Sequence, residues 1–190
     1  MMIRIGILGE IGAGKSYVAN NFGYPVFNAD LEVSKIYKKD KKIFLKLNKK
    51  LPKYITSFPI DKKQITEAIL GNNFNLKKIL SIVHSEVKKK MNLFLRKNKN
   101  KKIVILDIPL LLENKIYKKG DILVFVDSPI KEINKRLKKR SNFNNKLFKK
   151  FKKIQFKTAY KKKKAQFTIK NEYTKKSVDI GIINILNQIL

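Results

Sequence analysis

Eight residues near the N-terminus have the types and spacing of a phosphate-binding loop. The segment matches the pattern G-x-x-x-x-G-K-[ST] at every defined position and reads Gly9-Glu10-Ile11-Gly12-Ala13-Gly14-Lys15-Ser16. Its glycines allow the backbone to fold around phosphates with the N–H groups directed inward, at the start of a helix. The Lys15 ammonium would contact the β- and γ-phosphates of a nucleotide, and the Ser16 hydroxyl would help to bind Mg²⁺. These residues predict chemistry on a nucleotide phosphate.

Three acidic residues follow predicted strands and are candidates for the chemistry beside this loop. Asp30 comes just after a short strand over 25–28. A carboxylate there can accept a hydroxyl proton or contact metal-bound water, and a helix N-cap is an equally weighted alternative. Asp107 ends the apolar segment 103–106 and has the position of an acid that orients Mg²⁺. Glu113 is its rival for that role.

Two arginines and one histidine are further candidates. Arg136 and Arg140 are four residues apart, so we expect them on one helix face, where guanidinium groups can hold phosphate oxygens. The alternative is two solvated cations, and for Arg136 alone the residues favour it. His84 is the only histidine and lies in an apolar helical segment, where a packed histidine is commoner than a catalyst.

The elements that must position these residues alternate between strands and helices. We expect strands over 3–8, 25–28, 103–106, 121–126 and 166–170. Short helices are expected over 15–22 and after Pro129, and a closing helix over 178–190. This alternation predicts an α/β fold with a five-stranded parallel sheet and right-handed crossovers.

Two long segments between the strands are expected to be helical. Residues 30–96 form an insertion in which Asp61 and Gln64 have the spacing of a capping box, and a further helix begins near Asn75. A polar break over 141–145 precedes a very basic helical stretch over 146–164.

The composition excludes several classes of protein. There is no cysteine, so disulfides and thiolate-bound metals are excluded, and this fits a reducing compartment. No apolar stretch approaches the roughly 18 residues that span a bilayer, and no signal-peptide pattern is present. We therefore expect a soluble cytoplasmic protein with no membrane association.

The net charge of +31 has two interpretations. Basic surfaces attract polyanions, so one interpretation is nucleic-acid binding. However, the lysines are spread along the whole chain, and arginine, which reads bases and phosphates better, is scarce. Asn and Ile are also abundant. A compositional preference is therefore favoured over a specific nucleic-acid site.

Taken together, the chain resembles the dephospho-CoA kinase family along nearly its whole length. The most specific segment is Ile108-Pro109-Leu110-Leu111-Leu112-Glu113-Asn114, which closely resembles that family's Val-Pro-Leu-Leu-Phe-Glu signature. The other segments that resemble the family are the opening strand with its loop, Asn28-Ala29-Asp30, Val83-His84-Ser85, Arg136-Leu137, Arg140, Gln155, and Ala165 through Asn171.

The resemblance implies a P-loop kinase-type three-layer fold and the ATP-dependent phosphorylation of the ribose 3′-hydroxyl of dephospho-CoA. ATP would be the phosphoryl donor, with Mg²⁺ bound through Ser16. One domain would cover residues 1–190, with a core of 1–30, 101–137 and 165–190, a helical acceptor-binding insertion over 31–98 and a lid over 138–160. We favour a monomer.

The resemblance also assigns roles to individual residues. The implied catalytic residues are Asp30, Lys15 and Arg140. The implied nucleotide-binding residues are Gly9, Gly12, Ala13, Gly14, Lys15, Ser16, Tyr17, Arg136 and Arg140. The implied acceptor-binding residues are Asp30, His84, Pro109, Leu110 and Glu113.

The chain departs from the family pattern at several positions. Glu10 replaces a small glycine and brings a carboxylate near the phosphates, and Asn28 replaces the first acid of Asp-Ala-Asp. The alternatives are another small-molecule P-loop kinase, acting on a nucleoside, nucleotide or shikimate-like acceptor, and a basic nucleic-acid-binding ATPase. The segment from Pro109 to Glu113 favours dephospho-CoA as acceptor over the first alternative.

Overall fold

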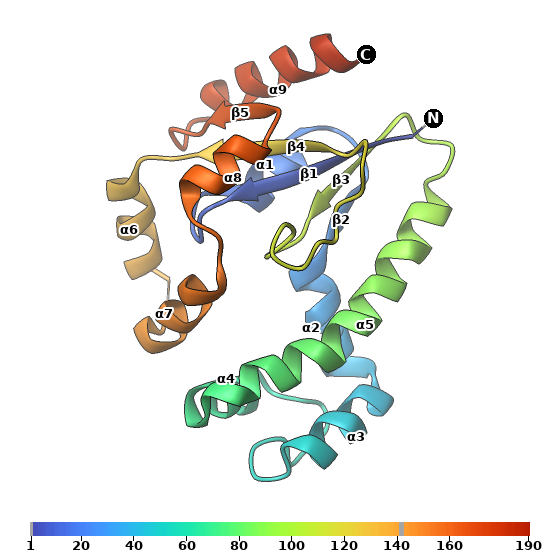
Figure 1. Cartoon of the computed structure of the whole chain (residues 1–190), viewed down its shortest axis with the longest axis vertical. Helices are drawn as coiled ribbons and strands as arrows, with labels where there is room; N and C mark the ends of the chain where they lie inside the picture. The colour runs from blue at the N-terminus through green and yellow to red at the C-terminus, as the bar shows by residue number, and fades with distance from the viewer. Residues whose placement is uncertain (1, 141–142) are drawn as a thin grey trace. The chain divides into compact units, whose positions relative to one another are not determined.

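The computed structural model describes residues 2–140 and 143–190, and its centre is a parallel β-sheet (Figure 1). The five strands pair in the order β2-β3-β1-β4-β5, and every pairing is parallel. Their bounds are β1 Ile3–Gly9, β2 Val26–Asn28, β3 Ile103–Asp107, β4 Ile122–Asp127 and β5 Phe167–Lys170. The five-stranded parallel sheet predicted from the sequence is confirmed.

The described helices connect and cover these strands. They are α1 Lys15–Asn21, α2 Ala29–Lys39, α3 Lys41–Lys50, α4 Lys62–Gly71, α5 Asn73–Lys97, α6 Ile130–Lys138, α7 Asn145–Ile154, α8 Thr158–Lys164 and α9 Lys175–Ile189. The chain divides into two compact units. The first comprises Met1–Asn28, Asn98–Asn144 and Lys150–Leu190, and the second Ala29–Lys97 and Asn145–Lys149.

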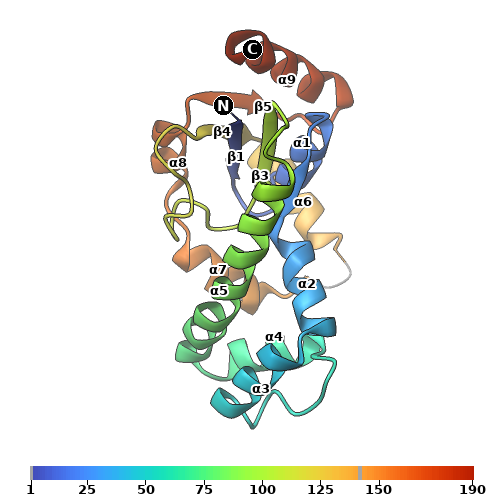
Figure 2. The same cartoon turned by 90° about the vertical axis from the view of Figure 1, so that its right-hand side faces the viewer.

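The sheet of the first unit is buried on both faces, as parallel sheets require. All five residues of β3 are buried, and so are six of the seven in β1. Helices α1 and α9 contact each other, and α8 contacts β1 and β4. Right-handed crossovers from β1 to β2 and from β4 to β5 run in opposite directions along the sheet. They therefore place α1 and α8 on opposite faces, as Figure 2 shows.

The second unit has its own apolar core, in which α5 contacts α2, α3 and α4. Residues at helical spacing along α5 supply its buried face: Leu76, Ile79, Val83, Val87 and Met91. The Asp61 carboxylate caps α4 by accepting from the Lys63 N–H, as predicted. The reciprocal half of the capping box is wrong. Gln64 instead accepts from the Thr56 N–H at 3.0 Å and donates to the Ser57 hydroxyl at 2.9 Å.

The basic stretch over 146–164 is helical, as predicted, and it forms two helices with a break between them. Helix α7 ends at Ile154 and α8 begins at Thr158. Between them, the Phe156 N–H donates to the Glu113 carboxylate at 2.8 Å, which a continuous helix would not allow. Of the polar break predicted over 141–145, residues 141–142 lie outside the described part of the chain. Among the described residues, no helix is long and apolar enough to cross a membrane.

Candidate active site

The phosphate-binding loop joins the carboxyl end of β1 to the start of α1, where the motif predicts it. Gly14 is the N-cap of α1 and has a φ of 85°, and Gly12 has a φ of 91°. Residues with a side chain rarely adopt these left-handed values, so glycine is needed at both positions. A Cβ at Gly14 would also lie 2.5 Å from the Asn171 amide nitrogen. The loop therefore has the backbone shape of an anion-binding nest.

Three side chains hold the carbonyl groups of this loop. The Ser128 hydroxyl and the Asn171 amide each donate to the Ala13 carbonyl at 2.9 Å. The Tyr173 hydroxyl donates to the Gly12 carbonyl at 3.0 Å. Because the C=O and N–H of a trans peptide point in opposite directions, fixing these carbonyls also fixes the direction of the N–H groups that follow.

Both charged side chains of the loop form hydrogen bonds with other residues of the first unit. The Lys15 ammonium donates to the carbonyl oxygens of Gly9 at 3.3 Å and Glu10 at 2.9 Å. These bonds hold the ammonium at the loop. The Glu10 carboxylate, the departure noted above, accepts a hydrogen bond from the hydroxyl of Thr158 at the start of α8. The Glu10 carboxylate is therefore held by the first residue of helix α8.

Asp107, at the end of β3, lies beside the first residues of α1. It is buried, its carboxylate accepts from the Asn28 amide at 2.7 Å, and the Ser16 hydroxyl also donates to it. Burial raises the pKa of Asp107, and the Ser16 bond, the Lys15 charge and the Asn28 bond oppose that rise. The structure therefore places Asp107, rather than Glu113, beside the residue predicted to bind Mg²⁺.

Hydroxyl and carboxylate oxygens suit Mg²⁺, which binds proteins through one or two such groups together with substrate phosphates and water. The neighbouring Ser16 and Asp107 fit that requirement. Within the described residues no group of three or more His, Cys, Asp or Glu side chains could hold a metal by itself. A metal here would therefore depend on the nucleotide phosphates for further ligands.

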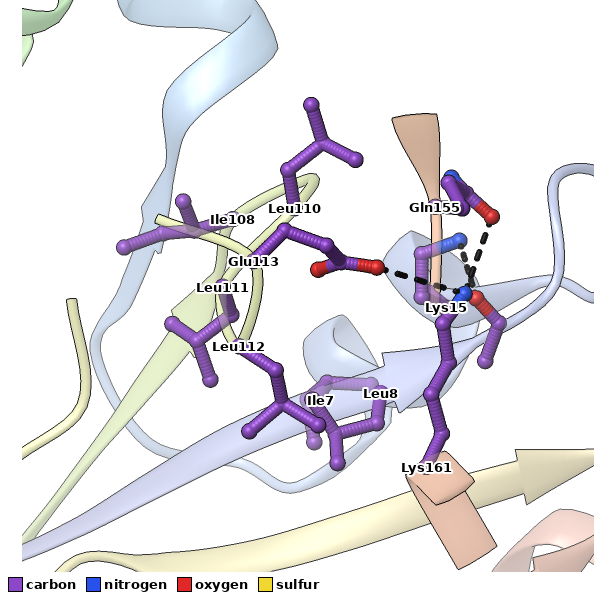
Figure 3. A pocket seen from close by; sticks show the side chains of 11 residues that line it. Ile7, Leu8, Lys15, Ile108, Leu110, Leu111, Leu112, Glu113, Gln155 and Lys161 are labelled. Atoms are coloured by element: carbon purple, nitrogen blue, oxygen red, sulfur yellow. Dashed lines mark hydrogen bonds and ion pairs between the residues drawn. The ribbon is translucent and has the colours of Figure 1, made fainter. Parts of the chain in front are cut away.

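A pocket lies between the loop after β3 and the phosphate-binding loop (Figure 3). Its apolar side includes Leu110, Leu111 and Leu112, and its polar side includes Lys15, Glu113, Gln155 and Lys161. The Lys161 ammonium lies 3.8 Å from the Glu113 carboxylate and donates to the Gln155 side chain at 2.9 Å. Lys161 is 4% exposed, so this charge is held inside the pocket by its partners. The geometry links the predicted signature loop to the segment that joins α7 and α8.

The two arginines do not lie on one helix face, so that prediction is wrong. Helix α6 ends at Lys138, and exposed Arg140 lies beyond its C-cap with its N–H bonded to the Leu137 carbonyl at 3.2 Å. This bond reaches back three residues instead of the four of an α-helix, and such a tighter turn ends the α-helix before Arg140. Arg136 remains in the helix, and its guanidinium carbon lies 4.3 Å from the centre of the Tyr173 ring. It is therefore not simply solvated.

Asp30 and His84 belong to the second unit. Helix α2 begins at Ala29, so Asp30 lies in the first turn of the helix rather than at its N-cap. His84 is half-buried in α5, and burial lowers its pKa, which favours the neutral imidazole.

Other predicted site residues belong to the first unit. Exposed Tyr17 follows Ser16 in α1, and Ala13 is buried in the loop. Pro109 and Leu110 are half-buried in the loop after β3, where Leu110 has a φ of 58°.

The sequence analysis missed Ser128, Thr158 and Tyr173. Ser128 and Tyr173 follow the carboxyl ends of β4 and β5, where loops of a parallel sheet converge. That position could have drawn attention to them. Thr158 carries no comparable signal, because its contact with Glu10 depends on the break between α7 and α8.

A parallel sheet of this order, with a complete phosphate-binding loop between β1 and α1, defines a P-loop kinase fold. A model of the family described as dephospho-CoA kinase matches residues 3–177. The chain belongs to the dephospho-CoA kinase family.

Individual relatives agree with this assignment. A dephospho-CoA kinase from Wolbachia sp. subsp. Brugia malayi (strain TRS) is 32% identical, over 97% of each chain. The crystal structure of TT1252 from Thermus thermophilus has a TM-score of 0.80 at 23% identity, covering 100% of this chain and 98% of the other. A dephospho-CoA kinase structure from Campylobacter jejuni has a TM-score of 0.63 at 21% identity, covering 98% and 96%. At these identities the two structures establish the fold.

Proposed function

We propose that this protein transfers the γ-phosphoryl group of ATP to the ribose 3′-hydroxyl of dephospho-CoA, giving coenzyme A and ADP. The bond between the γ-phosphorus and the β–γ bridging oxygen breaks, a bond from the 3′-oxygen to that phosphorus forms, and the hydroxyl proton is released. The observation that carries the proposal is the family match over residues 3–177, which includes a complete phosphate-binding loop in its required position.

The residues of that loop would supply most of the nucleotide binding. The N–H groups of the loop, from Gly9 to Ser16, surround the β-phosphate, and Lys15 moves from the loop carbonyls to the β- and γ-phosphates. Ser16, with Asp107 beside it, holds Mg²⁺. The metal, when bound, neutralises charge on the phosphate oxygens. Arg136 and Arg140 add positive charge on the nucleotide side, and Arg140 does so from the lid over 138–160. Ala13 and Tyr17 are further nucleotide-binding residues.

The acceptor would be bound by different residues. Asp30 orients the 3′-hydroxyl and accepts its proton, and His84 contributes from the helical insertion over 31–98. Pro109, Leu110 and Glu113 line the acceptor side from the loop after β3. We infer these roles from the family resemblance, and for Leu110 and Glu113 also from the pocket that they line with Lys15.

An assay with a panel of acceptors tests the proposal. Purified protein is incubated with ATP and Mg²⁺ and, in separate reactions, with dephospho-CoA, nucleosides, nucleotides and shikimate. We expect equal amounts of coenzyme A and ADP with dephospho-CoA, and only slow ATP hydrolysis otherwise. Faster transfer to any other acceptor would overturn the assignment of the acceptor while preserving the kinase class.

We further propose a cytoplasmic monomer with no specific nucleic-acid partner and no membrane partner. The absence of cysteine fits a reducing compartment, and lysines spread along the whole chain favour a general positive charge over a specific nucleic-acid site. Gel filtration coupled to light scattering measures the oligomeric state, and a mass near 22.2 kDa is expected.

A further inference from the structure

Tyr173 is an unusual residue for its backbone position. It lies between β5 and α9 with a φ of 61°, a left-handed conformation that costs free energy for any residue with a Cβ. Its N–H is held by the Asn171 side-chain oxygen at 2.9 Å. Contacts of the side chain must therefore favour the tyrosine enough to keep it in this conformation.

The hydroxyl of Tyr173 fixes one peptide plane of the phosphate-binding loop. It donates to the Gly12 carbonyl at 3.0 Å. The N–H of the same peptide belongs to Ala13, points the opposite way, and donates to the Glu10 carbonyl at 3.1 Å within the loop. This peptide plane is therefore fixed at both ends, by Tyr173 at its carbonyl and by Glu10 at its N–H. The Ala13 carbonyl is held by Ser128 and Asn171, whereas the Gly12 carbonyl is held by Tyr173.

The ring of Tyr173 has a second contact on the nucleotide side. The Arg136 guanidinium carbon lies 4.3 Å from the ring centre, within the range of a cation–π interaction. The ring edge also approaches the loop, because a Cβ at Gly14 would lie 3.8 Å from the Tyr173 Cε1 atom. One side chain thus links the loop backbone to a guanidinium on α6.

We propose that Tyr173 is a positioning residue for the nucleotide. It acts through two other groups: its hydroxyl fixes the Gly12–Ala13 peptide of the phosphate-binding loop, and its ring holds the Arg136 guanidinium beside the nucleotide site. The proposal rests on the proposed function in so far as ATP is taken to occupy this loop. It predicts an effect on nucleotide affinity rather than on acceptor binding.

The variant Y173F separates the hydroxyl from the ring. It removes the bond to Gly12 and keeps the face that contacts Arg136. We expect calorimetry with ADP and Mg²⁺ to give a Kd about three- to tenfold higher, as for one lost hydrogen bond. The KM for dephospho-CoA should stay at the wild-type value, and the melting temperature of the nucleotide-free protein should fall by only a few degrees. The matched control is Y160F, which removes a hydroxyl from an exposed tyrosine of α8 and should bind ADP as the wild type does.

The variant Y173G removes both contacts and adopts the left-handed φ without strain. Its Kd for ADP should rise further than that of Y173F, by more than about tenfold. Wild-type ADP affinity in either variant would overturn the proposal. A fall in melting temperature in Y173F with equal losses in ADP and dephospho-CoA binding would also overturn it, since it would show a purely structural role. Because ADP binding is measured without an acceptor, a failure to form coenzyme A tests the proposed function separately.

Discussion

The Lys15 ammonium donates to two carbonyl oxygens of its own loop, so the charge already lies at the loop that is expected to bind phosphates. Replacing it by methionine keeps the length and apolar packing of the side chain but removes the charge on the β- and γ-phosphates. We expect turnover to fall about 10³-fold or more, as when a major transition-state electrostatic contact is lost. Turnover is measured as coenzyme A formed per enzyme.

The control for Lys15→Met is Lys176→Met, which removes a positive charge from an exposed residue of α9 in the same unit. Both variants should unfold cooperatively near the wild-type temperature. A folded Lys15→Met variant with near-normal turnover would contradict the assignment of the phosphate-binding loop.

Asp30 allows a sharper test, because its structural and chemical roles predict different results. The residue lies in the first turn of α2, where a negative charge stabilises a helix by about 0.3–1 kcal/mol. Asp30→Asn should therefore lower the melting temperature by no more than a few degrees. If the carboxylate orients the hydroxyl and accepts its proton, kcat should fall about 10²- to 10⁴-fold, with the Kd for ATP unchanged.

Glu32 provides the matched control, since it is the other acid in the first turn of the same helix. Glu32→Gln removes the same helix-end charge and should lower the melting temperature similarly, but leave kcat unchanged. Equal kcat values for Asp30→Asn and wild type would leave Asp30 with a helix-stabilising role only, and Glu113 or Asp107 would be the next acids to test.

Residues were predictable from sequence to different degrees. The loop from Gly9 to Ser16 was predicted fully, because its function depends on backbone shape and a local pattern fixes that shape. The choice between Asp107 and Glu113 could not be made from sequence. Both acids follow β3, so the choice depends on how the chain folds after that strand: Asp107 ends β3 and accepts from Ser16, whereas Glu113 lies in the next loop and accepts from the Phe156 N–H.

At the scale of elements, β1 and the start of β4 are linked by a buried ion pair. The Arg4 guanidinium lies 2.9 Å from the Asp121 carboxylate, and their side chains are only 10% and 5% exposed. Burial raises the pKa of Asp121, while the Lys118 N–H and the Arg4 charge lower it. Arg4→Met would remove one of these compensating contacts and raise that pKa further.

Arg4→Met should therefore show a stability loss that depends on pH. A folded pKa above the unfolded value means that the folded state binds more protons, so stability falls as pH rises through the interval between the two values. We expect a loss of about 3–5 kcal/mol at pH 7, where the buried carboxylate has lost the guanidinium and keeps the Lys118 N–H bond, and a smaller loss near pH 4. Urea unfolding at both pH values measures it.

Adding Asp121→Asn to Arg4→Met removes the buried charge, so the double variant should recover most of the stability at pH 7. A loss in Arg4→Met that is equal at both pH values, or no recovery in the double variant, would show that the guanidinium acts by packing alone.

The predicted elements agree with the structure where local pattern decides them. The strands are apolar runs that end in polar or glycine residues, and their order along the chain implies parallel pairing. The break between α7 and α8 was missed because lysine-rich sequence favours helix throughout 146–164. A long-range bond from the Phe156 N–H to Glu113 overrides that preference. Gln64 likewise bonds to Thr56 and Ser57 of the preceding loop instead of its own helix end.

At the scale of the whole molecule, the charge of +31 is the property that local structure explains least. Some lysines are held by acids, as Lys162 is by Asp127 at 2.7 Å. The excess of 45 basic over 14 acidic residues nevertheless leaves a strongly positive chain. Such a charge attracts polyanions without specificity, and it would also increase the encounter rate with ATP and with a polyanionic acceptor.

The salt dependence of DNA binding separates this general attraction from a nucleic-acid function. Binding to random-sequence DNA should weaken by about 10³-fold or more between 50 and 200 mM salt, because counterion release drives it. At 200 mM salt, saturating DNA should leave both the rate of coenzyme A formation and the rate of ATP hydrolysis unchanged. DNA-stimulated ATP hydrolysis, or DNA affinity that persists at high salt, would support the nucleic-acid-binding ATPase instead. The distinction is physical: a built nucleic-acid site adds base stacking or hydrogen bonds, which salt does not screen, whereas dispersed lysines provide charge alone.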